Sequence, residues 1–245
     1  MKLAALILIA LTVTGATYAA DLKVGVETTD QYPIYSGAKG EYRGFARELL
    51  DDFAAKYQHT IHYVPLPIVQ LHDALLAHRI DLKFPDNPKW QPEKKKDAHI
   101  TYSNSVITVA EGLSVLQKKM GRPLADIKTI GAVRGFTPWP YMDTINAKKI
   151  TYREFGDFKS LVNAGLTGRI DGVYANNIVA NYYLIEVLKQ PNAMVFDFAL
   201  PNDRSEFYLS SIDHSEIIAQ FDEYLSKYKP EILVMKSKYH ISDSY

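Results

Sequence analysis

The sequence contains one nine-residue pattern twice, at residues 79–87 and, ninety positions later, at residues 169–177. Each copy reads Arg-Ile-Asp, two further residues, an aromatic residue, a small or cyclic residue, a polar residue and Asn. An apolar run with helical spacing precedes each copy. The pattern therefore predicts, in each half of the chain, a helix, a tight turn, a short buried strand and a polar tip. A simpler interpretation, that Arg-Ile-Asp is a common helix-to-strand connection, also fits the residues.

The repeat predicts two similar lobes that present polar tips to a shared cleft, because ligands of open α/β sheets lie beyond the carboxyl ends of strands. Asp86 and Asn176 occupy equivalent places at the two tips. They either face each other across the cleft or cap the helices that follow, a role that Asp and Asn readily take.

Residues 1–19 are typical of a secretory signal peptide: Lys2, an uncharged apolar run at 3–13, and small residues at 17 and 19 before a cleavage site. The run is too short for a permanent membrane helix, and no later stretch approaches ~20 apolar residues. The chain has no cysteine, which excludes disulfides, cysteine-ligated metals and a lipid-modified cysteine anchor. These features predict a periplasmic protein without a lipid anchor.

The chain remaining after residue 19 is long enough for two lobes of about 100 residues each. Without Lys2 it carries 27 basic and 28 acidic residues, so nothing indicates a nucleic-acid partner or an anionic membrane surface. Its 17 tyrosines suit the lining of a small-molecule cleft.

Apolar spacing predicts helices at 45–57, 152–166, 178–188 and 217–228, and strands at 22–26, 61–64, 130–133, 193–198 and 207–209. Thr137 followed by Pro138 predicts a helix N-terminus that could hold an anion. The lysines at 94–96 are typical of a solvated face.

The chain has no nucleophile-elbow, zinc-protease, phosphate-loop or dinucleotide-binding motif. Its seven histidines do not cluster. We therefore expect no metal, no cofactor and no catalytic residue, although a buried acid–base pair of carboxylates would escape a sequence search.

The order of these pieces resembles the bacterial family 3 extracellular solute-binding proteins, the periplasmic receptors typified by amino-acid uptake. The matching pieces are Val24-Gly25-Val26, Gly44-Phe45, residues 75–81, Ile100-Thr101-Tyr102-Ser103, residues 130–135, Gly168-Arg169-Ile170-Asp171 and residues 225–239. The resemblance implies an α/β, two-lobe periplasmic-binding-protein-like fold with two crossing segments and a ligand cleft between the lobes. The first lobe would comprise residues 20–110 and 205–245, and the second residues 111–204.

Two departures from the family pattern concern the ligand. Members that bind amino acids carry an Arg for the ligand carboxylate in a segment that here, at residues 91–96, offers only lysines. They also carry an Asp for the ammonium five residues after the second Arg-Ile-Asp, where this chain has Asn176. We therefore expect that the ligand is not an ordinary L-α-amino acid.

The predicted ligand-binding residues come from both lobes. Asp86 would meet an amine, Arg134 and Thr137 would meet an acid, and aromatic rings would cover the apolar part, whereas Trp139 would pack inside its own lobe. The full set is Tyr35, Asp86, Asn87, Trp90, Arg134, Thr137 and Asn176.

The leading hypothesis is a monomeric receptor that delivers a small polar or organic solute to an ABC importer or a membrane sensor. One alternative is an enzyme on the same fold, dehydratase-like or acting on peptidoglycan, with Asp86 as the acid or base. Another is a degenerate module that binds a protein partner.

Overall fold

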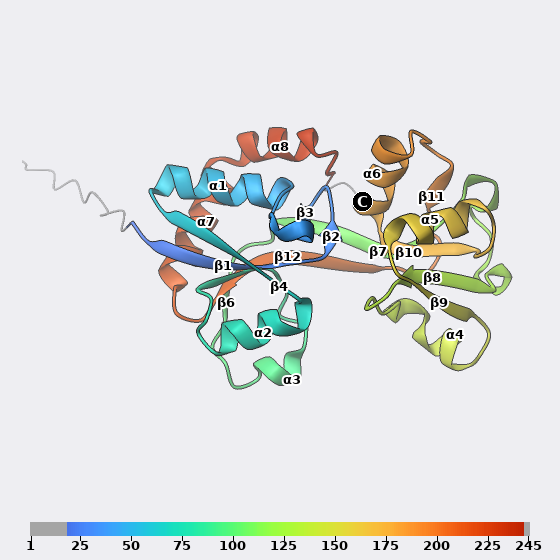
Figure 1. Cartoon of the computed structure of the whole chain (residues 1–245), viewed down its shortest axis with the longest axis horizontal. Helices are drawn as coiled ribbons and strands as arrows, with labels where there is room; N and C mark the ends of the chain where they lie inside the picture. The colour runs from blue at the N-terminus through green and yellow to red at the C-terminus, as the bar shows by residue number, and fades with distance from the viewer. Residues whose placement is uncertain (1–18, 243–245) are drawn as a thin grey trace, which may run out of the picture.

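The computed structural model describes residues 19–242, so the predicted signal peptide lies outside the described residues except for Ala19. The described chain forms two α/β lobes, one on each side of a long pair of strands (Figure 1). Within residues 19–242 no helix is long and apolar enough to cross a membrane.

The first lobe is built on a sheet in which β4 (Thr60–Leu66), β1 (Asp21–Glu27) and β5 (Leu82–Asp86) run parallel. β12 (Asp203–Ser211) joins β5 in the antiparallel sense and also pairs with β6 (Thr101–Tyr102). The helices of this lobe are α1 (Phe45–Tyr57), α2 (Ile68–Leu76), α3 (Pro92–Lys95), α7 (Ser215–Lys227) and α8 (Lys229–Lys238). A small ribbon of β2 (Asp30–Gln31) and β3 (Tyr35–Ser36) precedes α1.

The start of α1 shows how local sequence determines the structure of this lobe. Phe45, Leu49 and Phe53 are fully buried at a spacing of four residues, which puts them on one helix face. Gly44 precedes them at φ 105°, and a Cβ there would lie 2.9 Å from the carbonyl oxygen of Pro33. Only glycine suits this position, because the conformation and the close approach both exclude a side chain.

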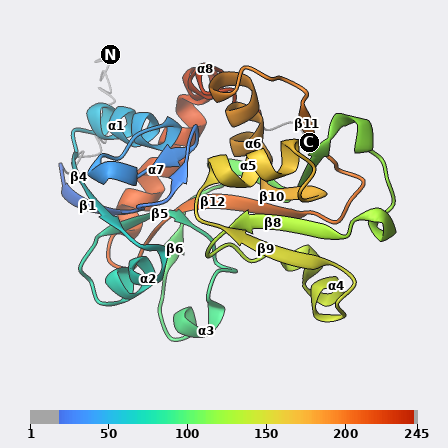
Figure 2. The same ribbon diagram turned by 45° about the vertical axis from the view of Figure 1, so that its right-hand side comes forward.

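The second lobe is built on β7 (Ile107–Leu116), β10 (Gly172–Asn176), β8 (Thr129–Val133) and β9 (Thr151–Phe155), in that order across the sheet. β11 (Met194–Phe196) pairs in the antiparallel sense with residues 114–116 of β7. The helices are α4 (Met142–Asn146), α5 (Phe158–Leu166) and α6 (Asn177–Tyr182), which continues as a π-helical turn at Tyr183–Val187. In Figure 2, α2 and α3 lie at the bottom of the first lobe and α4 at the bottom of the second.

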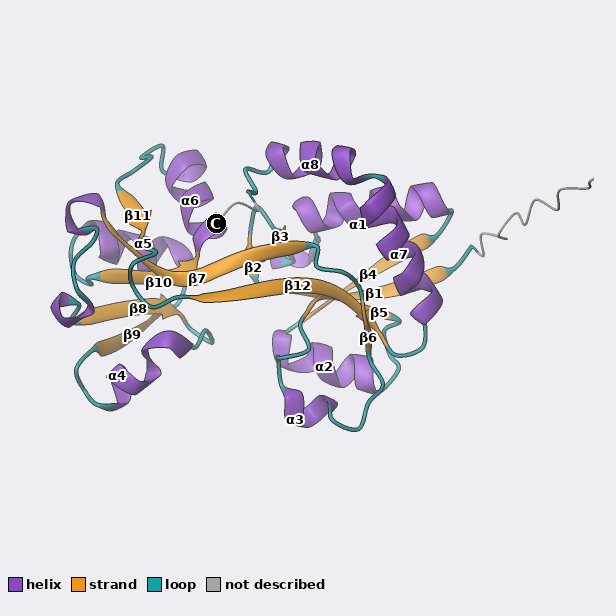
Figure 3. Cartoon of the chain, turned by 180° about the vertical axis from the view of Figure 1, so that it is seen from behind, coloured by secondary structure: helices purple, strands orange, loops and turns teal. Residues whose placement is uncertain are grey.

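β7 and β12 connect the lobes as an antiparallel pair, with a register that runs from Glu111 opposite Asp203 to Ile107 opposite Phe207. Seen from behind, the two strands lie side by side across the middle of the molecule (Figure 3). The predicted lobe boundaries, at residues 110 and 205, fall inside these strands.

Two local predictions were wrong. Residues 152–166 are β9 followed by α5, not one helix, and Asp157 caps α5 by accepting a hydrogen bond from the backbone N–H of Ser160 at 2.7 Å. No helix begins at Thr137: a short 3₁₀ turn covers Trp139–Tyr141, and α4 starts at Met142. Thr137 and Trp139 both precede prolines, and residues before proline disfavour the α conformation. The anion site predicted at that N-terminus therefore has no helix to support it.

The lobes touch each other directly. Ile178 and Val179 of α6 belong to the hydrophobic cluster that forms the core of the first lobe. The rings of Tyr32, from the first lobe, and Tyr182, from the second, meet edge to face with centroids 5.0 Å apart. The described conformation is therefore one in which the lobes are together.

Candidate functional site

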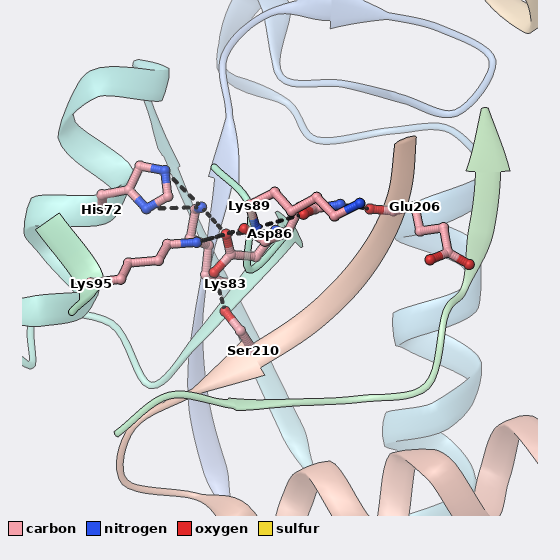
Figure 4. A network of polar contacts seen from close by, with 8 residues as sticks. His72, Lys83, Asp86, Lys89, Lys95, Glu206 and Ser210 are labelled. Atoms are coloured by element: carbon pink, nitrogen blue, oxygen red, sulfur yellow. Dashed lines mark hydrogen bonds and ion pairs between the residues drawn. The ribbon is translucent and has the colours of Figure 1, made fainter. Parts of the chain in front are cut away.

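The first repeat ends at the carboxyl end of β5, where Asp86 is fully buried. One carboxylate oxygen, Oδ1, lies 2.7 Å from Lys83 Nζ and 2.8 Å from Lys95 Nζ. The other, Oδ2, accepts a hydrogen bond from Ser210 Oγ at 2.7 Å. Figure 4 shows the lysines and the serine converging on Asp86 inside the lobe.

The charges of this network depend on one another. Burial opposes ionisation of Asp86, but Lys83 and Lys95 outweigh it and hold the pKa of the carboxyl below its ordinary value. Burial, with the charge of Lys83 next, lowers the pKa of His72 to about 4, so His72 is neutral near pH 7 beside Lys83. Both oxygens of Asp86 are thus engaged within the first lobe.

The neighbours of Asp86 also make contacts within the first lobe. Asn87 donates through Nδ2 to the carbonyl oxygen of Glu206 and accepts at Oδ1 from the N–H of Lys89, both at 2.8 Å. Trp90 is half-buried and packs edge to face on Phe207 of β12 with centroids 5.6 Å apart. Lys95 is buried, so the prediction of a solvated lysine face was wrong for this residue.

Tyr35 is buried and donates its hydroxyl to Glu27 Oε2 at 2.6 Å. Glu27, at the end of β1, also accepts from Thr29 Oγ1 at 2.9 Å. Burial raises the pKa of Glu27, and these two hydrogen bonds oppose the shift only in part. Tyr35 is therefore bonded to a buried carboxyl, Glu27, that the sequence reasoning missed, and neither residue lines the cavity described below.

Asn176, the last residue of β10, caps α6. Its Oδ1 accepts from the backbone N–H groups of Ile178 at 2.9 Å and Val179 at 3.4 Å. The capping alternative for Asn176 is thus realised.

Asn176 also lines a cavity of about 20 Å³ between the lobes. Gln31 contributes the wall from the first lobe. The second lobe supplies Val133, Phe136, Phe158, Tyr174, Ala175 and Asn176.

The remaining predicted residues lie elsewhere on the second lobe. Arg134 and Thr137 are exposed beyond the end of β8 and do not line this cavity. Trp139 is 69% exposed, so the prediction that it packs inside its own lobe was wrong. The prolines on both sides of Trp139 place it in the 3₁₀ turn instead of on an amphipathic helix.

The structure adds one further group that the sequence did not single out. Glu111, on β7, lies directly opposite Asn176 of β10 and also opposite Asp203 of β12. Burial raises the pKa of Glu111 to about 7, and the charges of Asp203 and Glu27 add to the shift. The sequence did carry one sign of this residue: Glu111 is a lone charged residue in an apolar strand. Such a residue lies either at a sheet edge or at a functional site.

Across residues 19–242, no group of three or more His, Asp or Glu side chains could hold a metal ion.

No protein-family model matches the sequence, and no curated protein matches it. Solved structures do match in fold. The GluR0 ligand-binding core in complex with L-glutamate superposes with a TM-score of 0.68 at 16% identity, covering 92% of this chain and 99% of that chain. An ABC uptake transporter substrate-binding protein from Streptococcus pneumoniae with bound histidine gives 0.66 at 22% identity, covering 91% and 93%.

A third match is a reconstructed ancestral amino-acid-binding protein described as a precursor of cyclohexadienyl dehydratase. It has a TM-score of 0.66 at 18% identity and covers 89% of this chain and 95% of that chain. At these identities the likeness shows the fold: this chain has the two-lobe fold of periplasmic binding proteins and of the GluR0 ligand-binding core. The fold predicted from the sequence resemblance is confirmed.

Proposed function

We propose that this protein is a periplasmic solute-binding receptor that captures one small polar or organic ligand between its lobes. It would deliver that ligand to an ABC importer or to a membrane sensor. The observation that carries the proposal is the cavity that Gln31 of one lobe and Asn176 of the other line together, at the carboxyl end of β10. Ligands of this architecture lie at such strand ends.

The ligand we propose is not an ordinary L-α-amino acid. A zwitterion buried between lobes needs a partner for each charge, because an unpaired buried charge is costly. In the segment that would supply a carboxylate anchor, Lys95 is held by Asp86, and Lys94 pairs on the surface with Asp73. Asn176 is neutral, and its Oδ1 already caps α6.

One observation favours a second candidate, an enzyme on the same fold. A general acid or base needs a pKa near the working pH, and Glu111 has one of about 7. Asp86, the residue nominated from the sequence, is held ionised by two lysines and does not meet this need. Recovery of the bound compound unchanged after long incubation supports the receptor, and its conversion supports the enzyme.

Two measurements test the receptor proposal. The first is the N-terminal sequence of protein from a periplasmic extract, which should begin at Ala20 or Asp21; intact Met1 on cytoplasmic protein contradicts export. The second is a thermal-shift screen of small solutes followed by small-angle scattering. A true ligand should raise the melting temperature and reduce the radius of gyration relative to the free protein. Absence of any stabilising solute contradicts the proposal.

A further inference from the structure

Three polar residues form a row across the middle of the sheet. Asp203 of β12 lies opposite Glu111 of β7, and Glu111 lies opposite Asn176 of β10. Residues directly opposite each other in antiparallel pairs project from the same face, with Cβ atoms about 4.5–5.5 Å apart. The row therefore places Glu111 beside Asn176, which lines the interlobe cavity, and Asp203 one strand further from it.

Tyr174 adds an independent sign of a ligand on this face. It lies two residues before Asn176, so its side chain projects from the same face of β10. Tyr174 is 3% exposed and lines the interlobe cavity, yet its hydroxyl has no hydrogen-bond partner among the described atoms. A buried phenol usually has a partner, so an unpartnered one in a cavity indicates a position that a ligand fills.

Two neighbouring carboxylates make the row acidic. Burial raises the pKa of Glu111, and the charges of Asp203 and Glu27 add to the shift, while the charge of Lys83 acts on Glu27. Burial raises the pKa of the Tyr174 phenol, and the charges of Glu111 and Asp203 come next among the causes. The strand register agrees, because Glu111 lies opposite Asn176, two residues along β10 from Tyr174.

The lining identifies the kind of cation that would balance this charge. A metal ion is disfavoured by the donor set, because the described residues include no cluster of three metal-binding side chains. Phe136, Phe158 and Tyr174 instead supply aromatic rings to the cavity. Aromatic rings next to carboxylates are the usual surroundings of organic ammonium groups.

We propose that Glu111, Asp203 and Tyr174, which we call the acidic hinge site, bind the cationic amine of the ligand held between the lobes. The inference rests on the proposed receptor function and names its ligand class: an organic amine with an apolar or aromatic portion. The ammonium donates hydrogen bonds to the Glu111 carboxylate and to the phenolic oxygen of Tyr174, which then has a partner. Phe136 and Phe158 cover the apolar portion.

The small volume of the cavity limits how a ligand can enter it. About 20 Å³ holds roughly one water molecule, so an amine enters only when Gln31 and the second lobe separate. The carboxylate row lies on β7 and β12, the strands that connect the lobes, so it is present in the open and the closed protein alike.

The test is calorimetric titration of the mature protein at pH 7.5 with phenethylamine, its neutral counterpart phenethyl alcohol, its anionic counterpart phenylacetate, 1,4-diaminobutane and the twenty L-amino acids. A fractionated small-molecule cell extract completes the panel. An amine should bind at least tenfold more tightly than its neutral and anionic counterparts. Glu111→Gln should weaken that binding ten- to a hundredfold, and Tyr174→Phe about three- to tenfold.

Glu206→Gln is the matched control, because Glu206 is an exposed carboxylate on the same strand as Asp203 and pairs with Tyr208. Its amine affinity should stay within twofold, and thermal melting should show that all three variants are folded. Tight binding of an acid or an amino acid, or amine binding that Glu111→Gln leaves unchanged, overturns the inference while the receptor stands. Absence of binding by every probe and every extract fraction overturns the receptor proposal and this inference together.

Discussion

Lys83 and Lys95 share a single acceptor, Oδ1 of Asp86, at 2.7 and 2.8 Å. All three side chains are buried. The contact ties the end of β5 to α3, and Ser210 ties it to β12. The polar tip of the first repeat is therefore an internal brace of the first lobe.

Removal of the Asp86 charge should destabilise the fold strongly, because two buried ammonium groups would lose their counter-charge. We expect Asp86→Asn to lower the free energy of unfolding by about 3–5 kcal/mol in urea titrations at pH 7. Asp73→Asn, which breaks only the exposed pair with Lys94, should cost about 0–1 kcal/mol. Equal effects of the two variants would contradict the role of Asp86 as a brace.

The stability of the protein should depend on pH through Glu111. Its pKa rises from 4.5 to about 7 on folding, so the native state holds this proton more tightly than the unfolded chain does. The stability that the proton supplies is complete below about pH 4.5 and is lost as the pH rises through about 7. The loss amounts to roughly 3 kcal/mol.

Comparison with a variant isolates this effect, because His72 acts in the opposite direction over nearly the same range. The pKa of His72 falls from 6.5 to about 4 on folding, so its contribution grows as the pH rises from 4 to 6.5. We expect the unfolding free energy of the wild type to fall relative to that of Glu111→Gln between pH 4.5 and 7. Asp203 and Glu27, the groups whose charges act on Glu111, are common to both proteins. Parallel curves would show that Glu111 titrates normally.

Asn176 should contribute to stability as a helix cap, independently of any ligand. Asn176→Ala removes the acceptor for the N–H groups of Ile178 and Val179 and should cost about 1 kcal/mol. Asn176→Ser keeps a capping oxygen and should recover most of that loss in thermal melts. An equal loss in the serine variant would argue that the amide acts through another contact.

The contact between Tyr32 and Tyr182 should hold the lobes together. Such ring pairs contribute about 0.5–1.5 kcal/mol, which changes the ratio of open to closed protein by up to roughly tenfold. We therefore expect Tyr182→Ala to increase the radius of gyration of the ligand-free protein in small-angle scattering. Tyr183→Ala removes a ring that packs on Phe158 of its own lobe and should leave the radius unchanged. Identical profiles for both variants would contradict the interlobe role.

Much of the fold followed from local patterns. Helix α1, strands β1, β4 and β8, and the two repeated strand ends could be predicted because apolar spacing and chain order are local properties. Residues 152–155 were misassigned because Tyr152 and Phe155 also fit a helical spacing with α5. The pairing of β9 with β8, which decides between the two, is a long-range contact.

The site was harder to predict than the fold. The repeat located Asp86 and Asn176 at strand ends, but the partners of Asp86 come from other elements: Lys95 from α3 and Ser210 from β12. Those partners decide whether a residue at a strand end faces the cleft or forms an internal brace of its lobe. The surroundings of Glu111 depend on strand pairing, which places Asp203 and Asn176 beside it from far away in the sequence.

The most direct test of the receptor account is native mass spectrometry of the protein, isolated from a periplasmic extract without unfolding. The account predicts one small organic molecule per chain, released on unfolding, recovered unchanged after incubation and able to bind again. The contradictory result is a bare protein mass that persists after exposure to a small-molecule cell extract, or a bound compound that the protein converts to another.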